Sequence, residues 1–271
     1  MFIAVFCIPC ICAILSKTAR TEETRTEKTP KTILRIMCYN IHHGRGMDDA
    51  VNLERTANVI KEWKPDLAAL QEVDKNTQRT NQTDQAKRLG EMLGMHSAFG
   101  KAIDFQGGEY GLAILSRFPI LEHQMILLPP EEQQEQRGLQ IVEIAIPDPQ
   151  HPDSQERRIR FANTHLSHSS QAERTAQFAK IDEILSVGNM PIILAGDFNA
   201  RPADDLVVQF LKNWRDTVDL ESDGKIAADR PAGRIDYIFF RTSDPFTVLE
   251  SRTIDDRITS DHMPIISVLA L

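Results

Sequence analysis

The sequence lacks most of the features that place a protein in a specialised class. Of its four cysteines, three lie in the first dozen residues (Cys7, Cys10 and Cys12), and only Cys38 lies in the rest of the chain. An internal disulfide is therefore excluded from that larger part. We interpret Cys7 and Cys10 as part of an apolar leader rather than as a metal or redox pair, because no second pair follows downstream. The formal net charge of −8 excludes a general electrostatic attraction to nucleic acids or anionic membranes.

Several common catalytic signatures are also missing. The sequence has no Gly-x-Ser-x-Gly elbow, Walker loop, His-Glu-x-x-His motif or Gly-x-Gly-x-x-Gly fingerprint. Gly44-Arg-Gly46 is too short a match for a dinucleotide site. We find no internal repeat and no long low-complexity segment, so repeat architectures are excluded as well.

The first 32 residues differ in composition from the rest. Residues 2–15 are uncharged and apolar, which is the length and character of a signal-peptide core and too short for a comfortable membrane span. We expect residues 1–16 to be a signal peptide or N-terminal anchor, 17–32 to be a polar linker, and 33–271 to form a single folded domain. A secreted or periplasmic location follows from this interpretation, and anchoring to the membrane through the N-terminus is the alternative.

Apolar runs and helical periodicity predict an α/β fold. Helices are expected at 52–63, 84–93, 171–185 and 204–211. Strands are expected at 33–40, 66–72, 111–116, 122–128, 139–146, 159–165, 191–195, 235–240, 246–252 and 262–269. Residues 107–110 are expected to form a loop, and the helix at 171–185 to bury a face that includes Ala172, Ala176 and Ala179. This many strands with few helices predicts two mixed sheets packed face to face with helices outside.

Polar side chains recur where these strands end or are interrupted. They are Asn40, Glu72, the pair Thr164-His165, Asp197 with Asn199, and the trio Asp236, Asp261 and His262. Carboxylate and amide oxygens are the ligands that Mg²⁺ or Mn²⁺ prefers, and Glu72 is the best single candidate. The histidines in this oxygen-rich set suit the binding or protonation of a phosphoryl oxygen better than Zn²⁺ binding, although Zn²⁺ stays an alternative.

This inventory meets the needs of phosphoester hydrolysis. That reaction requires an activated water, stabilisation of charge on the phosphoryl oxygens and help for the leaving oxygen. An Asp could act as the base, a metal and imidazoles as electrophiles, and an Asn could orient the water. Singly, each residue could equally be a strand cap or a structural ion-pair partner. Together, they favour a functional site.

Six short motifs carry a resemblance to a known family. They are Tyr39-Asn40, Gln71-Glu72, Thr164-His165-Leu166, Gly196-Asp-Phe-Asn199, Arg234-Ile-Asp236-Tyr and Ser260-Asp-His262. In this order, and spread from residue 33 to the C-terminus, they resemble the endonuclease/exonuclease/phosphatase superfamily, which includes apurinic endonucleases, deoxyribonucleases, sphingomyelinases and inositol polyphosphate phosphatases. The resemblance implies a four-layered α/β sandwich with a divalent-metal site at one end, so that 33–271 would be a catalytic domain.

The resemblance also implies a metal set. Glu72 would be the main Mg²⁺ ligand, Asn40 its neighbour, and Asp261 would be able to join them. Mn²⁺ is an alternative cation.

Phosphate and water would be handled by five further residues. Asp197 would activate or orient the attacking water, and Asn199 would hold this water and a phosphoryl oxygen. His262, held by Asp236, would contact the phosphate, and His165 would bind another non-bridging oxygen. The base is either Asp197 or His262.

The substrate is less well specified. We expect Arg137 to bind a substrate phosphate bidentately and the loops around Tyr110 and Arg137 to select the ester. Our first choice is a phosphodiester or phosphomonoester of a small molecule or lipid headgroup. The alternatives are a nuclease acting on DNA or RNA and a non-catalytic binding protein that retains the fold. No obligate protein partner is evident, and we expect a monomer.

Other polar residues could frame the site from neighbouring loops. We expect most of them to be solvated or structural: His42, His43, Arg79, Arg117 and His168.

Overall fold

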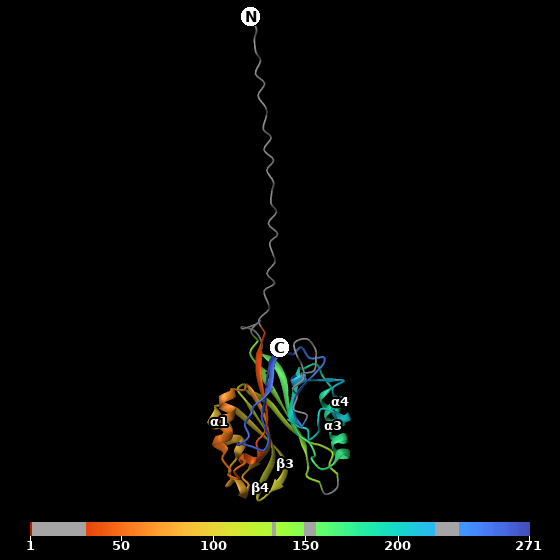
Figure 1. Ribbon diagram of the computed structural model, residues 1–271. Helices are drawn as coiled ribbons and strands as arrows, with labels where there is room; N and C mark the ends of the chain where they lie inside the picture. Colours follow the sequence, from red (N-terminus) through yellow and green to blue (C-terminus); the bar gives the residue numbers. More distant parts are fainter. Residues whose placement is uncertain (2–30, 132–133, 149–155, 220–232) are drawn as a thin grey trace.

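The computed structural model describes residues 1, 31–131, 134–148, 156–219 and 233–271. The expected signal segment, apart from Met1, and most of the expected linker lie outside these residues. Two six-stranded sheets stand face to face, with helices on their outer sides (Figure 1). Among the described residues, no helix is both long and apolar enough to cross a membrane.

The two sheets have matching topologies. The first sheet runs in the order β11 (Thr247–Thr253), β12 (Ile265–Ala270), β1 (Ile33–Asn40), β2 (Leu67–Lys75), β4 (Gly108–Ser116) and β3 (His96–Phe105). The second runs in the order β5 (Ile120–Leu127), β6 (Gly138–Ile146), β7 (Arg157–His165), β8 (Ile192–Asp197), β10 (Asp236–Arg241) and β9 (Trp214–Asp216). The pairs β1–β2 and β7–β8 are parallel, and the other neighbours are antiparallel.

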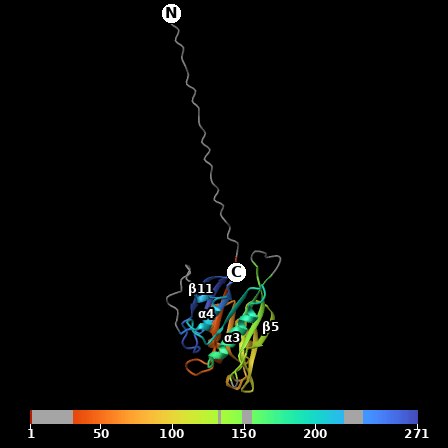
Figure 2. The same ribbon diagram turned by 90° about the vertical axis from the view of Figure 1, so that its right-hand side faces the viewer.

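Helices cover the outer face of each sheet. They are α1 (Leu53–Trp63), α2 (Gln85–Leu93), α3 (Gln171–Leu185) and α4 (Asp205–Phe210), joined by the short 3-10 turns η1 (His42–Gly44), η2 (Gln78–Thr80) and η3 (Thr217–Asp219). The first two pack on the first sheet. Helices α3 and α4 pack on the second sheet, as Figure 2 shows. Asn52 and Asp84 cap the starts of α1 and α2 with their side chains, which explains why both helices begin at these positions.

Side chains along each strand point alternately to the two faces of the sheet, so each sheet contacts one core on its inner face and another beneath its helices. In β1, Leu34, Ile36 and Cys38 face the core between the sheets, whereas Met37 and Tyr39 face the core beneath α1 and α2. A strand buried on both faces needs a nearly continuous apolar run. The expected sandwich of two packed mixed sheets flanked by helices is confirmed.

Some local expectations are wrong. Residues 108–110 do not form a loop: they open β4, which pairs with a strand, β3, that the sequence analysis missed along with the short β9. His262 precedes β12 rather than lying in it, since that strand begins at Ile265.

The buried face of α3 also differs from the expected one. Ala172, Ala176 and Ala179 are exposed, and Glu173 and Gln177 are buried instead. The two polar side chains are accommodated because they bond to each other and Gln177 accepts a hydrogen bond from the Ser167 backbone N–H, at 3.0 Å.

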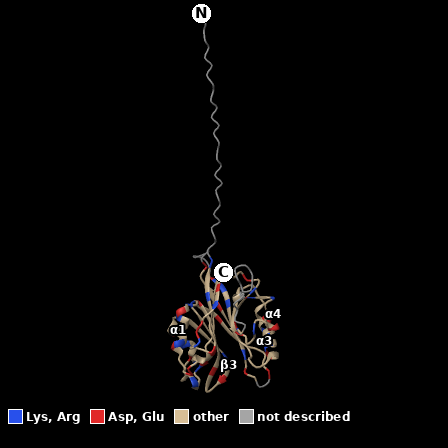
Figure 3. Ribbon diagram, in the orientation of Figure 1, with Lys and Arg blue, Asp and Glu red and all other residues tan. Residues whose placement is uncertain are grey.

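Charges of both signs are interspersed over the surface. Figure 3 shows Lys and Arg beside Asp and Glu across the described elements. Many of them pair locally, as Arg55 does with Asp48 and Lys101 with Asp104.

Candidate active site

Asp197, at the end of β8, lies at the centre of the polar cluster. Strand pairing places His165 of β7 and Asp236 of β10 directly opposite it, so three functional side chains share one row of the sheet. Its Oδ1 accepts a hydrogen bond from the backbone N–H of Asn199 at 3.0 Å, and its Oδ2 accepts one from Nδ2 of Asn40 at 3.2 Å. The carboxylate is thereby fixed between the two sheets.

The glycine before Asp197 is required by close strand packing. A Cβ at Gly196 would stand 2.3 Å from the backbone oxygen of Thr164. Only a residue without a side chain lets β7 and β8 approach closely enough to align His165 with Asp197.

His262 and Asp236 form a hydrogen-bonded pair beside Asp197. Nδ1 of His262 lies 2.8 Å from Oδ2 of Asp236, and its Nε2 lies 3.7 Å from Oδ2 of Asp197. Burial lowers the pKa of His262, but the hydrogen bond and charge of Asp236, followed by the charges of Asp197 and Asp261, outweigh burial and raise the pKa to about 10. Burial, and then the charge of Asp236, raise the pKa of Asp197 to about 7.

His165 is a buried neutral imidazole on the other side of Asp197. Its Nε2 lies 3.5 Å from Oδ2 of Asp197, and its Nδ1 accepts a hydrogen bond from Nη1 of Arg137 at 3.2 Å. Burial, the charge of Arg137 and the charge of His262 lower the pKa of His165 well below its usual range. Because Nδ1 is an acceptor, the proton of the neutral ring lies on Nε2, where it can donate toward the centre of the site.

Glu72 reaches the same centre from the first sheet. It lies inside β2 rather than at its end, at a bulge where the pairing with β4 shifts between Leu70 and Val73. Its backbone φ of 56° is in the left-handed region, which is uncommon for a residue with a side chain. The bulge turns Glu72 out of the strand's regular alternation.

A buried asparagine ties this bulge to the opposite sheet. Asn163 of β7 donates from Nδ2 to the backbone oxygens of Leu70 and Ala113, both at 2.9 Å, and its Oδ1 accepts from Nε2 of Gln71 at 2.7 Å. Every polar atom of the Asn163 amide is hydrogen-bonded. Gln71, the residue before Glu72, is therefore held in place by the opposite sheet.

Asn40 bridges the two acidic groups. Its Nδ2 donates to Oε1 of Glu72 at 3.0 Å as well as to Asp197, and its Oδ1 accepts from the backbone N–H of His42 at 3.1 Å. Asp261 stands at the edge of the group, where its Oδ1 lies 3.6 Å from Nδ1 of His42. In this arrangement Asn40 positions the carboxylates, and a role as metal ligand requires its amide oxygen to turn toward the cation.

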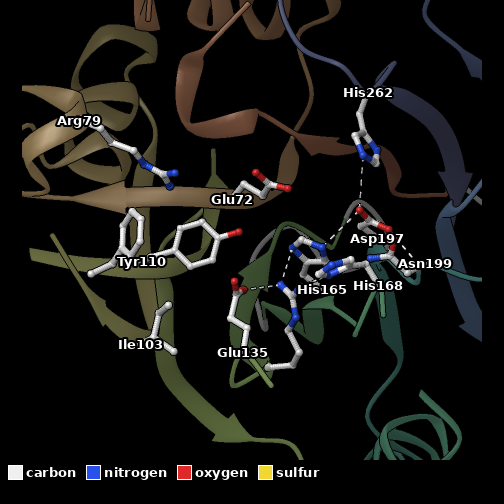
Figure 4. A pocket seen from close by; sticks show the side chains of 12 residues that line it. Glu72, Arg79, Ile103, Tyr110, Glu135, His165, His168, Asp197, Asn199 and His262 are labelled. Atoms are coloured by element: carbon white, nitrogen blue, oxygen red, sulfur yellow. Dashed lines mark hydrogen bonds and ion pairs between the residues drawn. The ribbon is translucent and has the colours of Figure 1, made fainter. Parts of the chain in front are cut away.

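These residues open onto a pocket of about 390 Å³ (Figure 4). Its lining combines the cluster around Asp197 with a wall from β3, β4 and η2: Ile103, Phe105, Tyr110 and Arg79. Burial, followed by the charge of Glu72, raises the pKa of Tyr110, which therefore keeps its phenolic proton at neutral pH. Figure 4 shows the Tyr110 ring and the Glu72 carboxylate across the pocket from His165.

Arg137 is buried at the base of this pocket. One guanidinium nitrogen contacts His165, the other lies 3.4 Å from Nδ1 of His168, and Nη1 pairs with Oε1 of Glu135 at 2.7 Å. Arg79 is held by two hydrogen bonds, of 2.7 and 2.8 Å, to the carboxylate of the fully buried Asp74. The two guanidinium groups are thus rigidly placed on different walls of the pocket.

The ten residues singled out from the sequence converge to different degrees. Those that line the pocket are Glu72, Tyr110, Arg137, His165, Asp197, Asn199 and His262. Asn40 and Asp236 lie behind this lining, and Asp261 lies beside His42. The pocket also contains Ile103, Phe105 and Glu135, which were not expected from the sequence. Arg79 and His168, which also line it, belong to the group that could frame the site but was expected to be mostly solvated or structural.

Different signals were available for these missed residues. Recognition of the β3–β4 hairpin around Gly107 and Gly108 would have placed Ile103 opposite Tyr110 and Phe105 two residues further along the same strand. Nothing local in the sequence distinguishes Glu135. Arg117, also considered, pairs with Asp66 away from the pocket.

Comparisons with known proteins agree with this geometry. Residues 37–262 match the model of the Endonuclease/Exonuclease/phosphatase family. Among curated protein sequences, none is significantly similar to the chain.

Solved structures share the fold at low sequence identity. An endonuclease/exonuclease/phosphatase protein from Beutenbergia cavernae is 24% identical, with a TM-score of 0.70, over 88% of this chain and 72% of that one. A mannosyl-6-phosphatase from Bacteroides thetaiotaomicron is 19% identical, with a TM-score of 0.63, over 88% of this chain and 100% of that one. The human Nocturnin catalytic domain with a bound sulfate anion is 21% identical, with a TM-score of 0.67, over 88% and 97% of the two chains.

Proposed function

Because the chain belongs to the endonuclease/exonuclease/phosphatase family, a family of phosphohydrolases, we propose that it is a divalent-metal-dependent hydrolase of small phosphoesters that acts by direct water attack. One observation carries the proposal. The carboxylates of Glu72 and Asp197, from different sheets, are joined by hydrogen bonds of 3.0 and 3.2 Å from the same Asn40 amide nitrogen. The imidazoles of His165 and His262 lie within 4 Å of Asp197.

The donor set around Glu72 suits Mg²⁺ or Mn²⁺. Glu72 would hold the cation, with Asn40 and Asp261 as further oxygen donors, and substrate and water oxygens would complete the coordination. When bound, such a cation supplies stabilisation of negative charge on a phosphoryl oxygen.

The remaining residues suit the handling of phosphate and water. Arg137 and protonated His262 offer positive charge, and the neutral Nε2–H of His165 offers a hydrogen bond, from different sides of the pocket. Asn199, whose Nδ2 donates to the Leu166 backbone oxygen at 3.0 Å, turns its amide oxygen away from that bond and can orient the water. Of the two candidates for accepting the proton of this water, Asp197 is favoured, because His262 already carries its proton below a pKa of about 10.

The shape of the pocket favours a small substrate over a polymer. A volume of about 390 Å³ accommodates a phosphate with one sugar or similar group. The wall of Tyr110, Phe105 and Ile103 offers an apolar or aromatic surface to that group, opposite the phosphate-binding side chains. The mixed surface charge offers no track for a nucleic acid backbone.

A substrate panel tests this proposal. The wild-type chain is assayed with sugar phosphates, glycerophosphodiesters, bis-p-nitrophenyl phosphate and supercoiled plasmid, each with Mg²⁺, Mn²⁺ or EDTA. We expect cation-dependent release from small esters, no activity with EDTA and no plasmid nicking. Asp197→Ala and His262→Ala should each reduce kcat/KM by about 10²-fold or more, because such groups contribute that much to hydrolysis.

The control is His96→Ala, which removes an exposed histidine of β3 far from the cluster in the fold. It should retain wild-type turnover. Near-normal turnover in both active-site variants would refute the assignment, and plasmid nicking without small-ester hydrolysis would replace it with a nuclease.

A further inference from the structure

Two histidines that the proposed reaction does not use lie next to Glu72. One ring nitrogen of His42, one of His43 and one carboxylate oxygen of Glu72 lie within 4.8 Å of one another. Around a tetrahedral ion with metal–ligand bonds of about 2.0–2.1 Å, the ligand atoms are about 3.4 Å apart. Side-chain rotations that move these three atoms by about 1 Å would therefore bring them to the distances that a bound cation requires.

The backbone is bent to bring both histidine rings to one side. Consecutive residues of an extended chain point in opposite directions. Here His42 and His43 have φ values of 46° and 45°, and Glu72 has a φ of 56°, so all three residues are in the left-handed region. Such conformations are uncommon for residues with side chains, and they cluster at functional sites as well as at tight turns.

A buried glutamine holds the turn in this shape. Nε2 of Gln85 donates to the backbone oxygen of His43 at 2.8 Å, and Oε1 of Gln85 accepts from the backbone N–H of Asp74 at 2.9 Å. The η1 turn is therefore fastened to β2, the strand that carries Glu72. The three side chains are part of one rigid substructure.

The imidazoles have unused binding capacity. His43 is 6% exposed, and the Nδ1 atoms of both His42 and His43 are buried without a hydrogen-bond partner. An unpaired buried polar atom destabilises the fold, and a cation that accepts the nitrogen lone pair removes that cost. Asp261, whose Oδ1 lies 3.6 Å from Nδ1 of His42, adds negative charge beside the group.

The positive charge of Arg79 acts on His43, and a neighbouring carboxylate partly offsets it. Arg79 is held in two hydrogen bonds by the buried carboxylate of Asp74, which offsets its charge. The other pair of pocket histidines differs in this respect, because Arg137 contacts both His165 and His168.

We infer that His42, His43 and Glu72 form a second cation site, selective for a borderline divalent ion of the Zn²⁺ or Co²⁺ class. Two imidazoles and one carboxylate are a donor set of zinc sites that keep an open position, whereas Mg²⁺ prefers oxygen donors. Glu72 is shared with the proposed Mg²⁺ site, so the second cation would lie at the edge of the pocket. This inference goes beyond the proposed function, since a cation can bind here whether or not an ester is cleaved.

Cobalt binding tests the site directly. The full-length chain is stripped of metal with a chelator, dialysed into Mg²⁺-free buffer and titrated with Co²⁺ while visible absorption is recorded. We expect saturation at one Co²⁺ per chain, with the strong visible bands of a four- or five-coordinate ion. Zn²⁺ should displace Co²⁺ and abolish the bands.

Matched variants assign the ligands. His42→Gln and His43→Gln should each weaken Co²⁺ binding by about tenfold or more, whereas His96→Gln, the same change at an exposed histidine, should bind Co²⁺ as the wild type does. Difference spectra between wild type and His42→Gln cancel any binding to the N-terminal cysteines, which both proteins contain. Circular dichroism melts check folding, and His42 is partly exposed, so His42→Gln is informative even if His43→Gln unfolds.

Two results would overturn the inference: a wild-type chain without visible Co²⁺ bands, or folded His42→Gln protein that binds Co²⁺ like the wild type. Neither result bears on Mg²⁺-dependent hydrolysis, which the substrate panel measures separately. Hydrolysis without a Co²⁺ site and a Co²⁺ site without hydrolysis are therefore distinguishable outcomes.

Discussion

At the scale of single residues, the pairing of His262 with Asp236 makes the stability of the fold depend on pH. The folded pKa of about 10 lies above the ordinary value of 6.5, so the protonated imidazole stabilises the fold fully below pH 6.5. That contribution is lost as the pH rises from 6.5 through 10. An NMR titration of the metal-free protein should therefore show the His262 ring protons shifting at a much higher pH than those of exposed His96.

Replacement of Asp236 tests whether its charge raises the pKa of His262. Asp236→Asn keeps the shape and a hydrogen bond to Nδ1 but removes the charge, so the His262 midpoint should fall by about 1–3 pH units. His96 should titrate unchanged in the same spectra. An Asp236→Asn protein with the wild-type midpoint would mean that Asp236 does not determine the charge of His262.

At the scale of secondary-structure elements, the sequence predicts the order of strands and helices well where local signals are strong. Helices α1 and α2 begin after Asn52 and Asp84, whose side chains cap them, and α2 ends at Gly94 in a left-handed conformation. Strand β3 was missed because its burial is partial and irregular, so its sequence lacks a clear period of two. The prediction failed at the alanines of α3 because Glu173 and Gln177 are buried instead, bonded to each other within the helix and, at Gln177, to the Ser167 backbone N–H outside it.

The same contrast holds for the candidate site. Strand ends such as Asn40, His165 and Asp197 follow from apolar runs that stop at a polar residue, because parallel neighbours bring such ends together. Glu72 was found by the same rule although it actually lies at a bulge within a longer strand. Of the aromatic wall, Tyr110 was named from the sequence, whereas Phe105 and Ile103 depend on the β3–β4 pairing, which the Gly107 and Gly108 turn signals but the irregular pattern of β3 obscures.

The link between the sheets at Asn163 gives a prediction at this scale. Asn163→Ala leaves the backbone oxygens of Leu70 and Ala113 and the side chain of Gln71 without their buried partners. At about 1–3 kcal/mol for each unpaired group, the free energy of unfolding should fall by at least ~2 kcal/mol. Urea denaturation measures this fall.

Asn163→Ala should also affect cation binding, because Asn163 holds the bulge that carries Glu72. Calorimetry should show weaker Mg²⁺ binding in folded Asn163→Ala protein, because Glu72 loses its anchored neighbour. Asn213→Ala, which removes an exposed amide bonded to Asp182 at 3.3 Å, is the matched control and should change stability by less than about 0.5 kcal/mol. Equal stability of the two variants would show that the link between the sheets is not needed.

At the scale of the whole molecule, the distribution of charge separates the small-substrate proposal from the nuclease alternative. The chain has 31 Lys and Arg against 39 Asp and Glu, and charges of both signs stand side by side along the elements in the view of Figure 3. Recognition of a small ester then depends on a few buried groups, chiefly Arg137 and His165, which salt screens little.

This difference appears in the salt dependence of turnover. Raising NaCl from 50 to 200 mM should change kcat/KM for a small phosphoester by only a few-fold. An enzyme that binds DNA through 6–10 phosphate contacts loses about 10³–10⁵-fold in affinity over the same range. If the cleaved ester were part of a nucleic acid, turnover on plasmid would collapse with salt, while Arg137→Ala would have little effect. We expect the reverse: nearly salt-independent turnover of small esters that Arg137→Ala reduces by about 10²-fold, because Arg137 is the buried cation that faces the phosphate side of the pocket.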